Sequence, residues 1–288
     1  MTVDIRRATD RFHTELDWLD SWHSFSFSSQ YDPANTHHGL LLVNNDDTVR
    51  AGGGFGTHPH RDMEIVTWVL DGELHHRDSA GHDGIIYPGL AQRMSAGTGI
   101  QHSEMNASGT ADVHFVQMWV PPDTEGIEPG YEQTDVGDEL ARGGLVTVAS
   151  GNGANGGVTI HQRDAELLAA RLSPGASVVV PASPHAHVFV PVGSDLTLVE
   201  VERINNRGEL FGIATLPSGD FHAFLLIPCK PGGEGCVDWT SASDRKAAES
   251  PVQTRTAEQL LQARTAMLHR LRSGWTARYS GPSAEPPK

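Results

Sequence analysis

The chain has 288 residues, enough for one large domain or two medium domains, each with an adequate hydrophobic core. Its formal net charge of −15, with no basic run, argues against direct nucleic-acid binding, because an acidic surface repels phosphate backbones. The 31 glycines and 17 prolines are typical of a turn-rich β protein, although a loop-rich α/β chain would have similar counts.

Two strands are predicted before residue 50. Phe25 and Phe27 alternate with serines, which is typical of a half-buried strand. The apolar run 39–43 is predicted to form the next strand. The polar run 44–47, Asn-Asn-Asp-Asp, is expected to close that strand as a hairpin loop, because Asn and Asp side chains favour turns.

Two pairs of candidate metal ligands follow, His58 with His60 and His102 with Glu104. Side chains at i and i+2 leave the same face of a strand, so each pair can direct two ligands toward one point. Two such strands side by side would bring four ligands together. Three imidazoles and a carboxylate suit Fe(II), Mn, Ni, Cu, Co or Zn and leave coordination positions open. The simpler alternative is a set of unrelated surface histidines, since the chain has 16 of them.

The residues around the two pairs are also specific. The first pair lies in Gly-Thr-His58-Pro-His60-Arg, and the second lies in Ala-Gly-Thr-Gly-Ile-Gln-His102-Ser-Glu104-Met. These stretches resemble the two signature motifs of the cupin superfamily, and their sequences are similar to those of the pirin family. The resemblance covers most of the chain before residue 235. It implies an all-β fold of two tandem cupin barrels, each a double-stranded β-helix or jelly roll, followed here by a predicted C-terminal helix.

The resemblance also implies a ligand set. In pirins a metal, usually iron, is bound by both histidines of the first motif and by the His and Glu of the second, which gives His58, His60, His102 and Glu104 here. Most cupins use a glutamate of the first motif instead, here Glu64, and its strand parity matches that of the first pair. Parity leaves both carboxylates open. The resemblance favours Glu104 as the ligand and leaves Glu64 to orient a ligand histidine or to take a proton from a substrate.

A strand is predicted at 65–70, where β-branched and aromatic residues are dense, and the Asp-Gly pair at 71–72 is a strong hairpin signal. His75, His76 and His82 belong to the polar connection around this hairpin and are expected to face solvent.

The next clear strand is Val113–Val120, which ends at two prolines. Its Gln117 or His114 could face the metal cavity, or both could be satisfied polar groups in the wall of the barrel. The alternation of the strand does not choose between these interpretations.

Three regions are expected along the chain: an N-terminal metal-binding barrel (1–135), a degenerate C-terminal barrel (136–240), and a linker, helix and disordered tail (241–288). Short strands at intervals of about 8 to 12 residues predict the second barrel. They are expected at 145–149, 159–162, 165–172, 176–181, 187–192, 196–201, 212–216 and 223–227. A capping box at Thr256 and an apolar face predict a helix that ends at Gly274.

The second half keeps one His-x-His motif, formed by His185 and His187, but no His-x-Glu pair follows it. With two good ligands only, this half is expected to bind no metal, as the resemblance to pirins also implies. Cys229 and Cys236 lack the CxxC spacing of metal sites and are interpreted as two incidental thiols.

Several functions are compatible with these features. The resemblance implies a metal-dependent dioxygenase that cleaves a flavonol such as quercetin with O₂. The alternative that the resemblance also implies is an iron-dependent, redox-sensitive regulator that binds a transcription factor or a metabolic enzyme. A metal-stabilised barrel without turnover is the third alternative. Without a signal peptide or an apolar run of about 18 residues, a cytoplasmic protein with no membrane segment is expected.

Overall fold

The computed structural model describes residues 6–153, 156–173, 176, 178–181 and 183–192, and the backbone of three further strands at 197–204, 210–215 and 221–228. Within this part, residues 6–27 and those from 32 onward form one compact unit. The unit is almost entirely β-structure, as predicted, with a 3-10 turn η1 (Ala8–Asp10) and one short helix, α1 (Gly137–Ala141). No helix in the described part of the chain is long and apolar enough to cross a membrane.

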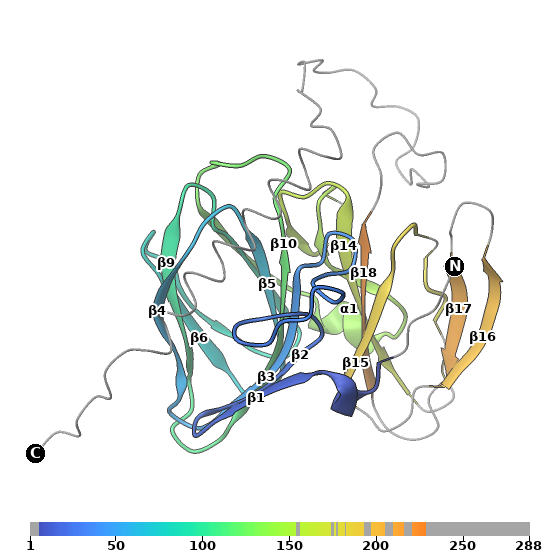
Figure 1. Ribbon diagram of the computed structural model, residues 1–288, viewed down its shortest axis with the longest axis horizontal. Helices are drawn as coiled ribbons and strands as arrows, with labels where there is room; N and C mark the ends of the chain where they lie inside the picture. The colour runs from blue at the N-terminus through green and yellow to red at the C-terminus, as the bar shows by residue number, and fades with distance from the viewer. Residues whose placement is uncertain are drawn as a thin grey trace, which may run out of the picture. The chain divides into compact units, whose positions relative to one another are not determined.

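The first half contains two antiparallel sheets that face each other (Figure 1). The larger sheet has the order β1 (Phe12–Leu16), β2 (Leu19–His23), β3 (Val43–Val49), β10 (Val113–Val120), β5 (Glu64–Asp71), β8 (Leu90–Ser95) and β11 (Gly130–Asp135). The smaller sheet has the order β4 (Gly54–His60), β9 (Ile100–Asn106), β6 (Leu74–Asp78) and β7 (Asp83–Ile86).

The second half repeats this all-β architecture on a smaller scale. One sheet has the order β13 (Val158–Thr159), β12 (Val146–Ser150), β14 (Ala165–Leu172), β18 (Phe221–Pro228) and β15 (His187–Val192). A two-stranded ladder consists of β16 (Thr197–Ile204) and β17 (Leu210–Thr215). All strand pairs are antiparallel except β12 with β13.

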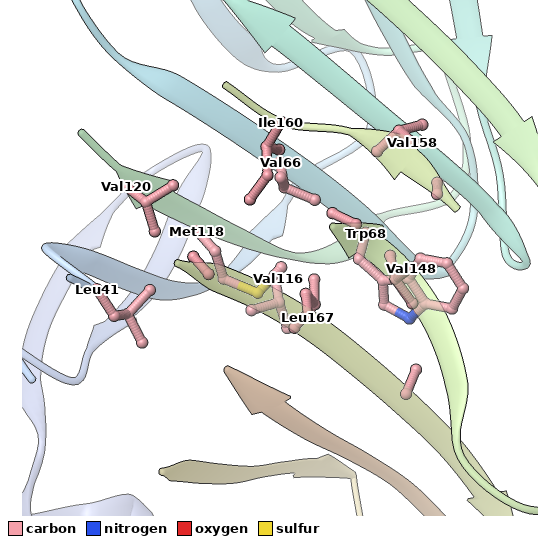
Figure 2. Packing of buried hydrophobic residues seen from close by; sticks show 14 of the residues in the cluster. Leu41, Val66, Trp68, Val116, Met118, Val120, Val148, Val158, Ile160 and Leu167 are labelled. Carbon is pink, nitrogen blue, oxygen red and sulfur yellow. The ribbon is translucent and has the colours of Figure 1, made fainter. Parts of the chain in front are cut away.

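Alternating side chains of the larger sheet are divided between two cores. One face of β5 and β10 contributes Val69 and Phe115 to a cluster that packs against Leu74 and Ile86 of the smaller sheet. The opposite face packs against the second half, because apolar residues of both halves share one cluster. Figure 2 shows this cluster, with Leu41, Val66, Trp68, Val116, Met118, Val120, Val148, Val158, Ile160 and Leu167 labelled. Burial of apolar surface between the halves therefore joins them, and β5 is covered on both faces.

Three strand predictions were accurate at both ends. The predicted strands Val113–Val120, Ala165–Leu172 and His187–Val192 are confirmed with unchanged bounds. The described residues of the predicted strand at 176–181 form only an isolated bridge position at Val179. The predicted C-terminal helix, the tail and both cysteines lie outside the described residues.

Three predictions near the N-terminus were wrong. The predicted strand at 39–43 is mostly a turn, with an isolated bridge between His38 and Leu41, and the strand begins only at Val43. The run 44–47 is not a hairpin loop but the middle of β3, and its four side chains are buried. They are tolerated there because neighbouring strands supply partners, for example His23 of β2, whose Nδ1 lies 2.9 Å from Oδ1 of Asn45. The strand expected at Phe25 and Phe27 lies earlier, at Leu19–His23, and Phe25 belongs to the core between the halves.

Candidate metal centre

The two predicted ligand pairs lie on neighbouring strands of the smaller sheet. Strand β4 pairs with β9 so that His58 is directly opposite His102. The ring centroids are 4.3 Å apart for His58 and His102, 5.0 Å for His58 and His60, and 4.9 Å for His60 and His102. All three imidazoles are buried, and one nitrogen atom of each lies within 4.8 Å of those of the other two. The structure therefore brings the three predicted histidines together.

These distances fit a single bound ion. With a metal–nitrogen bond of about 2.1 Å, two imidazoles at a right angle have ring centroids roughly 4.6 Å apart, and a tetrahedral angle increases this to roughly 5.3 Å. The observed centroid distances, from 4.3 to 5.0 Å, lie on both sides of the value for a right angle. The three histidines would therefore be able to hold one ion together.

The orientation of His58 is fixed by the backbone of its own strand. Its Nδ1 lies 2.6 Å from the carbonyl oxygen of Gly56. A carbonyl can only accept a hydrogen bond, so Nδ1 carries the proton and the lone pair is on Nε2. The pairing of β4 with β9 is irregular between Phe55 and His58, where a bulge changes the register. The bulge turns this segment so that His58 faces His102.

Glu104 is buried two residues from His102, on the same face of β9. Its carboxylate groups with His76 and His102, with ligand atoms within 4.8 Å of one another, in a second set that shares His102 with the first. Both carboxylate oxygens accept hydrogen bonds from Nε2 of Gln117 at 2.9 Å, and Oε1 also accepts one from Thr67 at 3.3 Å. The two donors on the larger sheet thus hold the carboxyl group of Glu104 beside the histidines.

The strand Val113–Val120 supplies two side chains to this site. Indole Nε1 of Trp119 donates a hydrogen bond to Oε1 of Gln117 at 3.0 Å, which leaves the amide NH₂ of Gln117 directed at Glu104. The Trp119 ring also meets the His60 ring edge to face, with centroids 4.9 Å apart. Of the two alternatives left open by the sequence, Gln117 reaches the site. His114 instead contacts Asp46 at 2.6 Å.

Glu64 is not brought to the histidine cluster. Its buried carboxylate accepts hydrogen bonds through Oε2 from the hydroxyl of Ser95 at 2.8 Å and from the backbone N–H of His161 at 3.0 Å. His161 belongs to the second half. The parity argument does not carry from β4 to β5, because the connection between them turns at Asp62, whose φ of 47° is outside the strand region. Glu64 shares its face of β5 with Val66, which packs against the second half, and not with Thr67.

The expectation that His76 faces solvent was wrong. The burial pattern of β6 places Leu74, His76 and Asp78 inward, and His76 is fully buried. Burial lowers the pKa of His76, so its imidazole is neutral near pH 7. Burial alone would raise the pKa of Asp78, but hydrogen bonds from His82 and His76 outweigh it and hold this pKa below its usual value.

His75 and His82 are closer to the expectation. His75 contacts Asp83 at 2.6 Å at the surface, and His82 is partly exposed, with its Nδ1 2.9 Å from Asp78. The parity of His76 with the buried Leu74 was the signal in the sequence that could have separated it from its two neighbours.

The fold and site define a class: two all-β halves in tandem, the first with a buried cluster of three histidines and a carboxylate. Residues 4–120 match the family model described as Pirin. The Mycobacterium tuberculosis H37Rv protein Rv0181c, provisionally named a quercetin 2,3-dioxygenase, is 63% identical over 193 residues, covering 67% of this chain and 79% of the relative. A quercetin 2,3-dioxygenase of Escherichia coli K12 is 47% identical over 165 residues, covering 57% and 70%. The chain belongs to the pirin family.

A solved structure agrees with this assignment. The bacterial pirin YhhW of Escherichia coli, in complex with nickel(II), superposes with a TM-score of 0.67 at 35% sequence identity, covering 78% of this chain and 98% of that one. Its coverage extends well beyond the matched residues 4–120, so the similarity includes part of the second half.

Proposed function

We propose that the chain is a metal-dependent dioxygenase that cleaves a flavonol such as quercetin with O₂, using an Fe(II) ion held by His58, His60, His102 and Glu104. The convergence of three buried imidazoles on one point, with a carboxylate beside them, carries the proposal. The names of the Escherichia coli and Mycobacterium tuberculosis relatives support the substrate class.

When bound, the ion supplies Lewis acidity and open positions for oxygen-donor substrates. The protein's own groups hold the ligands before the ion arrives. The Gly56 carbonyl keeps the lone pair of His58 on Nε2, and Gln117 with Thr67 keeps Glu104 in place. Such pre-positioning lowers the entropy lost when metal and substrate bind.

The flavonol hydroxyl must lose its proton to bind a metal well, and a carboxylate within hydrogen-bond reach can accept that proton. Glu104 is the carboxylate that lies beside the histidines, whereas Glu64 lies on the opposite face of the larger sheet, where it contacts the second half. We therefore assign the base to Glu104 and give Glu64 a structural role.

The test is oxygen consumption by protein with a full complement of Fe(II), verified by elemental analysis. Mixed with quercetin, this protein should consume O₂ and bleach the flavonol absorption, and metal-free protein should do neither. Glu104→Gln replaces an anionic oxygen donor with a neutral one and should lose metal and turnover together. If fully loaded wild-type protein consumes no more O₂ than free iron does, flavonol oxygenation is excluded. The redox-sensitive regulator, binding a protein partner, then becomes the leading function.

The identity of the ion is tested separately, by plasma mass spectrometry of protein purified without added metal. The donor set also suits nickel, which the Escherichia coli pirin YhhW holds in its structure, and manganese, copper, cobalt or zinc. Iron as the principal metal supports the proposal, and another principal metal would replace iron in it.

A further inference from the structure

A series of buried, hydrogen-bonded polar side chains connects the candidate ligand His102 to residues of β6. Nδ1 of His102 lies 3.4 Å from Nδ1 of His76, and Nε2 of His76 lies 3.3 Å from Oδ2 of Asp78. The side chains of His76 and Asp78 are 1% and 0% exposed, so water does not compete for these contacts. Asp78 sits directly opposite His102 in the pairing of β6 with β9.

The position of Asp78 is fixed by several donors. Its Oδ1 accepts hydrogen bonds from the backbone N–H groups of Ala80 at 2.9 Å and His82 at 3.0 Å, and its Oδ2 accepts one from Nδ1 of His82 at 2.9 Å. The turn that provides these donors continues through Gly81, whose φ of +97° suits glycine. The carboxylate therefore keeps one orientation and presents only acceptor oxygens to His76.

The donor and acceptor roles of His76 and His102 follow from the carboxylate of Asp78. A carboxylate cannot donate, so Nε2 of His76 carries its proton. Nδ1 of the neutral His76 ring is then an acceptor, and Nδ1 of His102 must be the donor to it. The proton of His102 is on Nδ1, which puts its lone pair on Nε2, the same tautomer that the Gly56 carbonyl imposes on His58.

We propose that Asp78, acting through His76, fixes the tautomer of His102 that can bind a metal ion through Nε2. Asp78 and His76 are thus positioning residues of the metal centre. Tyr131 supports them, because its ring lies against both His76 and His82, with centroids 4.8 Å and 5.1 Å away. The inference concerns the same centre as the proposed function and rests on that function for its metal affinity, but the tautomer itself can be measured without metal.

Asp78→Asn tests the proposal most directly, because asparagine has nearly the same side-chain shape as aspartate. Asn must keep its oxygen toward the amides of Ala80 and His82, so its NH₂ group replaces Oδ2. Nε2 of His76 then accepts, Nδ1 of His76 donates, and Nδ1 of His102 accepts. The proton of His102 moves to Nε2 and blocks the nitrogen that would bind the metal.

Asp83→Asn is a matched control on the same hairpin. Asp83 also contacts a histidine, with its Oδ1 2.6 Å from Nε2 of His75. The Asp83→Asn substitution removes the same unit of charge as Asp78→Asn. Asp83 lies at the surface, away from the site. His76→Gln is a second variant: its NH₂ group can replace Nε2 as the donor to Asp78, whereas no atom takes the position of Nδ1, the acceptor for His102.

The primary measurement is ¹⁵N NMR of the histidine rings in metal-free full-length protein. Wild-type His102 should carry its proton on Nδ1, Asp78→Asn should move it to Nε2, and Asp83→Asn should leave it unchanged. Zn²⁺ affinity, from competition with a chromogenic chelator, should fall about 10- to 100-fold in Asp78→Asn and His76→Gln, and less than about twofold in Asp83→Asn.

An unchanged His102 tautomer in Asp78→Asn would overturn the proposal. If wild-type protein binds Zn²⁺, equal Zn²⁺ affinities of the Asp78→Asn and Asp83→Asn proteins would also overturn it. Coordination of Zn²⁺ by Nδ1 of His76, visible in the same spectra, would also overturn it, because His76 would then be a ligand. If wild-type protein bound no metal but Asp78→Asn inverted the tautomer, the proposed function would fail while the positioning of His102 by Asp78 would be supported.

Discussion

Buried ionisable side chains in the first half make the stability of the folded protein depend on pH. Asp47 of β3 is 3% exposed and accepts a hydrogen bond from the Ser21 hydroxyl. Burial, with smaller contributions from neighbouring carboxylates, raises the pKa of Asp47 to about 8. The folded protein therefore keeps this proton at pH values where the unfolded chain, with a carboxyl pKa of about 3.9, has lost it.

The free energy of unfolding should consequently fall as the pH rises from about 4 to about 8, with a contribution from Asp47 of up to about 1.4 kcal/mol per pH unit. Asp47→Asn keeps a neutral group of the same shape and removes this contribution. Urea unfolding of the metal-free proteins should show that the variant gains stability relative to wild type as the pH increases over this range. Parallel pH profiles of the two proteins would contradict the assignment.

At the scale of single elements, the approach of β4 to β9 decides whether the ligands meet. A Cβ atom on Gly54 would lie 2.6 Å from the backbone oxygen of Glu104 and 2.6 Å from Cα of Met105, and Gly54 has a φ of +155°. Gly54→Ala should therefore push the two strands apart beside the carboxylate. We expect a loss of about 1–3 kcal/mol in stability, together with weaker metal binding.

Gly56→Ala is the matched control on the same strand, because a Cβ atom there would meet nothing within 4 Å. Its stability should stay within about 0.5 kcal/mol of wild type. The comparison uses thermal unfolding and Zn²⁺ titration of both variants. Equal effects of the two substitutions would show that strand separation at Gly54 does not control the site.

At the scale of the whole molecule, Glu64 ties the two halves together. Its Oε2 accepts hydrogen bonds from Ser95 in the first half and from the backbone N–H of His161 in the second. Glu64→Gln should weaken these charge-assisted bonds and cost about 1.5–3 kcal/mol in the free energy of unfolding. Metal affinity should change by less than about twofold, because the site is independent of this contact.

Glu132→Gln provides a comparison at the same junction, where Glu132 accepts from Arg93 at 2.8 Å and from the backbone N–H of Thr159 at 3.0 Å. The Glu132 side chain is 33% exposed, so its loss should cost less than that of Glu64. Chemical denaturation and metal titration of both variants check this. A large loss of bound metal in Glu64→Gln without a loss of stability would indicate that Glu64 is a metal ligand.

The sequence by itself determined the features that depend on local periodicity and on short motifs. The strand Val113–Val120 was found with its observed bounds because it is dense in β-branched and aromatic residues and two prolines end it. The i, i+2 spacing of His58 with His60 and of His102 with Glu104 correctly placed each pair on one strand face.

The tertiary structure decided which faces and which partners those residues meet. Asn45 and Asp47 form part of a buried strand because β2 supplies His23 and Ser21 as partners, and composition alone predicts a turn there. Glu64 faces the second half because the turn at Asp62 resets strand parity. His76 is buried because its face of β6 is covered by side chains such as Tyr131 of the larger sheet. Burial and partner choice depend on neighbours that are distant in the chain, so local pattern could not determine them.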